Sequence, residues 1–129
     1  MSWIESIGTY LVNNNYGVAG SSLFIGQLPD VGAAVLLTEY DGNIIETNAS
    51  GIALYQPSLQ IRVHGEPEDY TTPRDKIKAI QAALAGITNQ TVNGTYFLRI
   101  KPSSTILSLG QDEALAFGFS ANFEVTYDE

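Results

Sequence analysis

The run of residues 55–65 constrains the fold of this chain more than any other stretch. Its apolar residues Leu59, Ile61 and Val63 alternate with polar ones, which is the period of a strand with one buried face. An acidic turn follows, and a helical pattern begins directly after it. This order predicts a central strand that leads into a helix.

The helix after this strand has both of its ends marked in the sequence. Thr72 suits the N-cap, Pro73 suits the first helical position, and Gly86 suits the position just past the last turn. The apolar residues between them recur with the helical period: Ile77, Ile80 and Leu84. We therefore expect a helix at about residues 73–85.

A second helix is expected at the N-terminus. Ser2 and Glu5 have the spacing of a capping box, in which hydroxyl and carboxylate each accept a hydrogen bond from the other's backbone N–H. The residues that share one helical face are Trp3, Ile4, Ile7 and Leu11. The asparagine run at 13–15 tolerates a left-handed cap, so this amphipathic helix is expected at about residues 2–13.

The remaining apolar runs predict strands. They lie at residues 33–40, 95–101, 105–109 and 115–127, and a return strand is expected to begin at 44–45. The run at 21–27 is either a first strand or an extended segment. Asp41 and Gly42 have the composition of a tight hairpin turn. In the run at 95–101, strict alternation places Tyr96, Leu98 and Ile100 on one face.

Strands on either side of a helix, without strict alternation of strand and helix, favour the α+β class. The expected fold is a mostly antiparallel mixed β-sheet with two α-helices, about 2–13 and 73–85, packed on one face. A chain of 129 residues without repeats or linkers is expected to form a single domain, 1–129.

The charge of the chain excludes several classes of function. Fourteen acidic against six basic residues give a net charge of −8, and the few bases are dispersed, so sequence-specific binding of nucleic acid is not expected. The chain has no cysteine, which rules out disulfides and thiolate metal sites. The first residues lack the basic stretch and the long apolar run of a signal peptide. We therefore expect a soluble, cytoplasmically made protein without a membrane span.

His64 is the single histidine, and three acidic residues follow it: Glu66, Glu68 and Asp69. One interpretation is a small metal- or ligand-binding α+β module centred on His64. The other is a half-exposed strand residue at a turn. The spacing meets no rule for a metal site, which favours the second interpretation.

The chain shows no pattern of an enzyme. Residues 39–46 resemble part of a calcium loop but lack its spacing, and no phosphate loop, dinucleotide fingerprint or nucleophile elbow occurs. No catalytic residue, metal site or cofactor is therefore predicted.

A set of charged and polar residues is predicted to form an assembly interface. Arg62, Arg99 and Lys101 lie on polar strand faces, where they are either solvated or pair with acids of an adjacent copy. The expected loops at 41–53 and 102–113 are further contact elements. The full set is Asp41, Asn43, Glu46, Arg62, Arg99, Lys101, Asp112 and Glu113.

Three segments carry a resemblance to a known family. They are YQPSLQIRVHGE, with Pro57 before the strand; PRDKIKAIQAALAG; and the closing FGFSANFEVTY. In this order, after a short amphipathic helix and an apolar strand pair, they resemble the tail terminator proteins, also called minor capsid or tail completion proteins, of long-tailed bacteriophages. The resemblance extends over most of the chain.

The resemblance implies a structural virion protein at the head-proximal end of the tail, assembled in the cytoplasm of the host bacterium. Such a protein forms a ring, usually of six, on the last ring of the tail tube, although the isolated chain can be monomeric. It ends tube polymerisation, contacts the tube protein, and offers a surface to the head connector. DNA passes through the lumen without specific binding. A neighbouring head-completion or tail-to-head joining protein is the alternative within this class.

Overall fold

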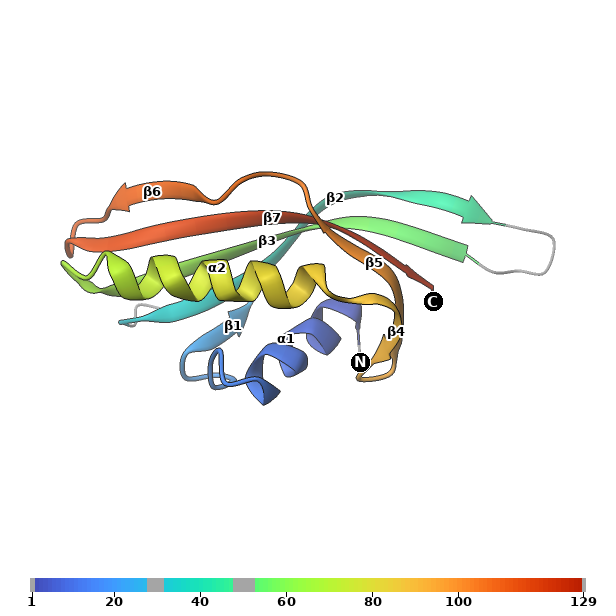
Figure 1. Cartoon of the computed structure of the whole chain (residues 1–129), viewed down its shortest axis with the longest axis horizontal. Helices are drawn as coiled ribbons and strands as arrows, with labels where there is room; N and C mark the ends of the chain where they lie inside the picture. The colour runs from blue at the N-terminus through green and yellow to red at the C-terminus, as the bar shows by residue number, and fades with distance from the viewer. Residues whose placement is uncertain (1, 28–31, 48–52, 129) are drawn as a thin grey trace.

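The computed structural model describes residues 2–27, 32–47 and 53–128, and for residues 41–47 and 53 it describes the backbone alone. The elements follow in the order α1 (Trp3–Asn13), β1 (Leu23–Ile25), β2 (Ala34–Thr47), β3 (Ala53–Pro67), α2 (Thr71–Ala85), β4 (Thr88–Val92), β5 (Thr95–Pro102), β6 (Leu107–Gln111) and β7 (Ala116–Asp128). Figure 1 shows the long strands running side by side, with both helices below them in this view.

The seven strands form one mixed sheet in the order β1-β2-β3-β7-β5-β4, and β6 pairs with β7 outside this path. The β1–β2 pair is parallel and the other pairs are antiparallel. Strands β5 and β6 lie one after the other along the same edge of β7, since β5 pairs with its second half and β6 with its first half. The predicted central strand, β3, lies between β2 and β7.

The predicted fold class is wrong. Among the described residues strands far exceed helices, so the protein is mostly β, and its sheet curls into a half-barrel. Helix α2 contacts the central strands β3, β7 and β5, whereas α1 contacts the edge strands β1 and β4 together with β2. Helix α2 therefore lies over the middle of the sheet, and α1 lies where its two edges approach each other.

The curl has a local cause that strand periodicity does not reveal. The pairing register shifts at irregularities in the β2–β3, β3–β7, β5–β7 and β6–β7 pairs. Each such bulge bends its strand and increases the right-handed twist. A sheet bent in this way brings both of its edges toward α1.

Both predicted helices are present. The Ser2 hydroxyl accepts from the Glu5 N–H, the Glu5 carboxylate accepts from the Ser2 N–H, and Asn15 adopts the left-handed conformation after the helix, with φ of 66°. The second helix begins earlier than expected. Thr72 is not its N-cap, because the carboxylate of Asp69 accepts from the Thr72 N–H instead.

The concave side of the sheet holds the core. Alternate residues of β3 and β7 are fully buried there, as their periodicity predicted, and they pack against the apolar stripes of both helices. The largest of the fully buried side chains include Phe97, Phe119, Phe123, Leu59, Ile61, Ile77, Ile80 and Leu84.

Two local predictions are wrong. Asp41 and Gly42 form no hairpin turn, because β2 continues through them to Thr47 with only a register shift between Tyr40 and Gly42. In β5, the shift between Phe97 and Arg99 changes the buried face, so that Phe97 lies in the core beside Ile100. The first prediction depended on the turn composition of Asp-Gly and the second on strict alternation, and a bulge overrides each of these local signals.

The junction of β3 and α2 requires glycine at position 65. A Cβ atom there would lie 2.6 Å from Cγ of Pro73 and 3.0 Å from the carbonyl oxygen of Asp69. Because a proline ring and a backbone carbonyl cannot turn aside as a flexible side chain can, we expect Gly65→Ala to destabilise the protein by about 1–3 kcal/mol. Urea unfolding followed by circular dichroism measures this loss.

Gly118→Ala is the matched control for this prediction. A Cβ atom at position 118 would meet Leu109 at 3.5 Å, which is an ordinary contact. We expect it to change the unfolding free energy by less than about 0.5 kcal/mol, as at sites away from strain. Equal losses for the two variants would refute the close-approach explanation.

Candidate assembly surface

The described residues contain no cluster of three or more His, Cys, Asp or Glu side chains that could hold a metal ion. His64 lies on the convex side of the sheet, with its Nδ1 3.8 Å from Oδ2 of Asp112, and both side chains are partly exposed. Glu66 points elsewhere, toward the N–H of Ala33. The histidine and the acids that follow it in the sequence therefore do not converge on one site.

One surface pocket of about 500 Å³ lies between α1 and β1. Its lining is mostly apolar and includes Val12, Leu23 and Ile25, with Glu5 as its acidic residue. The backbone N–H of Ser2, followed by its hydroxyl, lowers the pKa of the Glu5 carboxyl. Glu5 is thus an ionised helix cap and a poor general base.

No helix in the described part of the chain is long and apolar enough to cross a membrane.

A row of exposed residues follows the convex side of β5. Tyr96 and Arg99 are exposed and pair with Asp128 and Thr126 of β7, and Lys101 lies further along the same side. Arg99 reaches to 3.9 Å from Glu124, in an ion pair that is itself largely solvated. We call Tyr96, Arg99 and Lys101 the cationic row.

Arg62 differs from the other two predicted basic residues. It lies in the middle of the convex side, opposite Leu36 of β2 and Ser120 of β7. Its Nε atom is buried and has no hydrogen-bond partner in the described part of the protein. Arg62 therefore covers the sheet with its stem, and it is less available to a partner than the cationic row.

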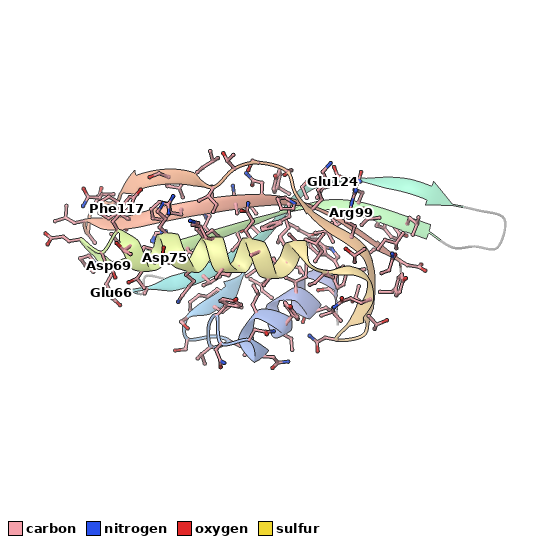
Figure 2. All side chains as sticks on the ribbon, viewed as in Figure 1. Glu66, Asp69, Asp75, Arg99, Phe117 and Glu124 are labelled. Atoms are coloured by element: carbon pink, nitrogen blue, oxygen red, sulfur yellow. The ribbon has the colours of Figure 1, made fainter. Side chains whose placement is uncertain are left out.

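Acidic residues gather at the opposite end of the molecule. They come from the β3–α2 turn and the β6–β7 turn, which meet where the N–H of Glu68 donates to the carbonyl of Leu115. Figure 2 shows Glu66 and Asp69 at this end and Arg99 far from them along the long axis. We call this group the acidic end: Glu66, Glu68, Asp69, Asp112 and Glu113.

Two of these acids also shape the backbone. One carboxylate oxygen of Asp112 accepts from the N–H groups of Ala114 and Ala116, at 2.8 and 3.0 Å, and so holds the β6–β7 turn. The Thr72 hydroxyl, together with the backbone N–H groups of Thr72 and Thr71, lowers the pKa of Asp69. Glu113 is exposed and free to meet a partner.

The structure thus separates the predicted interface residues. Arg99 and Lys101 share one row, Asp112 and Glu113 share the acidic end, and Arg62 lies between them. Asp41, Asn43 and Glu46 belong to β2 by their backbone, but their side chains lie outside the described residues. The expected loop at 102–113 is only partly a loop, since β6 occupies Leu107–Gln111.

Sequence reasoning missed two features of this surface. The first is β4 with its tight turn to β5, which Asn93 and Gly94 signal as an Asn-Gly pair with positive φ at both residues. The second is the exposure of Leu107, Leu109 and Leu115, of which 46%, 50% and 48% remain accessible. The short apolar alternation of β6 indicated a strand. No sequence signal showed that its apolar side chains would stay exposed to solvent.

Comparison with known proteins adds three findings. The model of the family described as "Bacteriophage tail terminator protein" matches residues 10–129. A chain from the structure titled "Virion of native gene transfer agent (GTA) particle" is similar with a TM-score of 0.60 and 12% sequence identity, over 85% of this chain and 81% of that chain. At this identity the structural similarity establishes a shared fold. No curated protein sequence matches.

Proposed function

Because the chain belongs to the bacteriophage tail terminator family, whose members are structural proteins of the virion tail, we propose that it forms a ring on the end of the tail tube. The ring stops further addition of tube subunits. Its opposite surface meets the head connector, so the partners of the chain are its own copies, the tube protein and a connector protein.

The separation of charge along the protomer is the observation that carries this proposal. The acidic end lies at one end of the long axis, and Arg99 of the cationic row lies far from it (Figure 2). A contact between different surfaces of identical copies is heterologous, and it closes into a ring when the rotation between neighbours completes a full turn. Opposite charges on the two surfaces favour that head-to-tail order over contacts between like ends.

The net charge of −8 suits a ring through which DNA passes. Tight binding to DNA requires clustered cations that release counterions, and an acidic protein offers few of them. A lumen lined by such a protein repels the phosphate backbone and lets the DNA move. DNA is accordingly proposed to pass the ring without specific binding.

The length of tails assembled without the chain tests the terminator role. A second experiment tests the ring contact itself. Lys101→Glu and Glu113→Lys, made separately, each place like charges in the proposed contact, and we expect each to weaken association between neighbours by about fivefold. Sedimentation velocity and negative-stain images over a range of protein and salt concentrations measure the fraction in rings.

The double variant and a control complete this experiment. Combining Lys101→Glu with Glu113→Lys restores opposite charges and is expected to recover much of the lost association. Lys78→Glu makes the same charge change on the exposed side of α2 and is expected to leave the rings unchanged. If both single variants form rings as the wild type does at low salt, the proposed contact is wrong.

A further inference from the structure

Strand β6 is an open edge of the sheet. Within the described residues its one strand partner is β7, and all five residues from Leu107 to Gln111 are exposed. Figure 1 shows β6 along the outer border of the sheet, with no helix beside it. The outward N–H and C=O groups of such a strand can form main-chain hydrogen bonds with another extended segment.

The side chains of β6 give this edge an exposed apolar surface that another segment can contact. Leu107 lies opposite Ser120 on the convex side. Leu109 lies over Gly118, since a Cβ atom at position 118 would be 3.5 Å from the Leu109 side chain. Proteins usually protect exposed edges with lysine, proline, a covering segment or a β-bulge, and of these β6 has a bulge between Ser108 and Gly110. Residues 107–111 contain neither lysine nor proline, and both leucines remain about half accessible.

The charges around β6 define what can bind there. Asp112 and Glu113 follow the strand directly, and the acidic turn at 66–69 is joined to the same end through the Glu68–Leu115 hydrogen bond. Neither this turn nor residues 107–115 contain lysine or arginine. A segment with basic residues among apolar ones complements both the leucines and the acids.

This chain itself has no suitable strand to offer. Its strand cations are Arg62 in β3 and Arg99 and Lys101 in β5. Strand β3 already lies between β2 and β7, and β5 lies between β4 and β7. A second copy would therefore have to break its own sheet to supply a basic strand.

We propose that β6 binds an extended segment of a different protein, in which lysine or arginine alternates with apolar residues, as an added strand. The leucines contact its apolar side chains, and the acidic end contacts its basic ones. The proposed place in the tail makes this partner a protein of the virion. The contact requires no ring, and in a ring the segment shares the acidic end with the cationic row of the neighbouring copy.

The test uses the full chain and a blocked nine-residue peptide in which lysine alternates with valine or threonine. Calorimetry measures its affinity, and amide chemical shifts locate it. We expect binding at residues 107–111 that weakens as salt increases. The same peptide with glutamate in place of lysine is expected to bind at least tenfold more weakly.

Two variants and a control identify the residues of this chain that contact the peptide. Leu109→Lys removes an exposed apolar contact and adds a repelling charge, and Glu113→Lys changes charge alone. We expect a loss of affinity of about tenfold or more for the first and a smaller one for the second. Glu39→Lys, at an exposed position of β2, is the matched control and is expected to bind as the wild type does. Since β6 is exposed, near-ultraviolet circular dichroism should show an intact core in each variant.

Several results would overturn the inference. They are equal affinity for the lysine and glutamate peptides, shifts located away from β6, or unchanged affinity in Leu109→Lys. A fourth is that Leu109→Lys abolishes self-association, since β6 would then contact a second copy. Because rings are measured separately by sedimentation, failure of this inference is distinguishable from failure of the ring proposal.

Discussion

Phe123→Ala is expected to lower the free energy of unfolding by about 3–5 kcal/mol. Phe123 is fully buried near the middle of β7, opposite Leu59 of β3 and Pro102 of β5. Strand β7 pairs with three other strands, so a cavity at this position lies where the halves of the curled sheet join. The surrounding backbone is held on both sides and can collapse only partly into the cavity.

Urea unfolding followed by tryptophan fluorescence and circular dichroism measures this loss. Tyr96→Ala is the control, because it also removes a large aromatic side chain from the sheet but from an exposed position. We expect it to cost less than about 1 kcal/mol. Similar losses for the two variants would show that Phe123 does not lie in the core.

Removal of this chain from the phage that encodes it is expected to produce tails of uncontrolled and often extended length that fail to join heads. The physical reason is that a tube end offers the same surface after every added ring. Polymerisation therefore continues until a different protein covers that surface. Electron microscopy of infected-cell lysates measures the distribution of tail lengths and the fraction of free heads.

Wild-type protein supplied from a plasmid should restore the normal length and the joining of heads. The Lys101→Glu variant should restore them poorly, and the double charge variant better. Tails of normal length joined to heads in the complete absence of the chain would refute the terminator role. Tails of normal length that fail to join heads would instead assign the chain to the joining step.

The helices and the long strands β3 and β7 were predictable because their signals are local. The capping box of Ser2 and Glu5, the apolar period of α2, and the alternation around Phe123 each depend on residues a few positions apart. The start of α2 was misplaced because Asp69 replaced Thr72 in the capping role, and both residue types can perform it.

The candidate surface was predictable only in part. Arg99 and Lys101 were correctly expected on one polar side of a strand. Strict alternation put Phe97 on that side too, and this prediction is wrong because a bulge lies between Phe97 and Arg99. The exposure of Leu107 and Leu109 could not be read from their alternation, since the same pattern describes a strand with a covered face.

The sequence by itself determined the two helices and the strands β3 and β7, the sign of the charge, and the absence of any catalytic pattern. Each of these follows from composition or from contacts between near neighbours in the chain. Only the tertiary structure decided that the sheet curls, that β6 remains an open edge, and that the acidic end lies far from Arg99. Those properties arise from pairing between distant strands, and the position of each bulge depends on the partner strand as well as on its own residues.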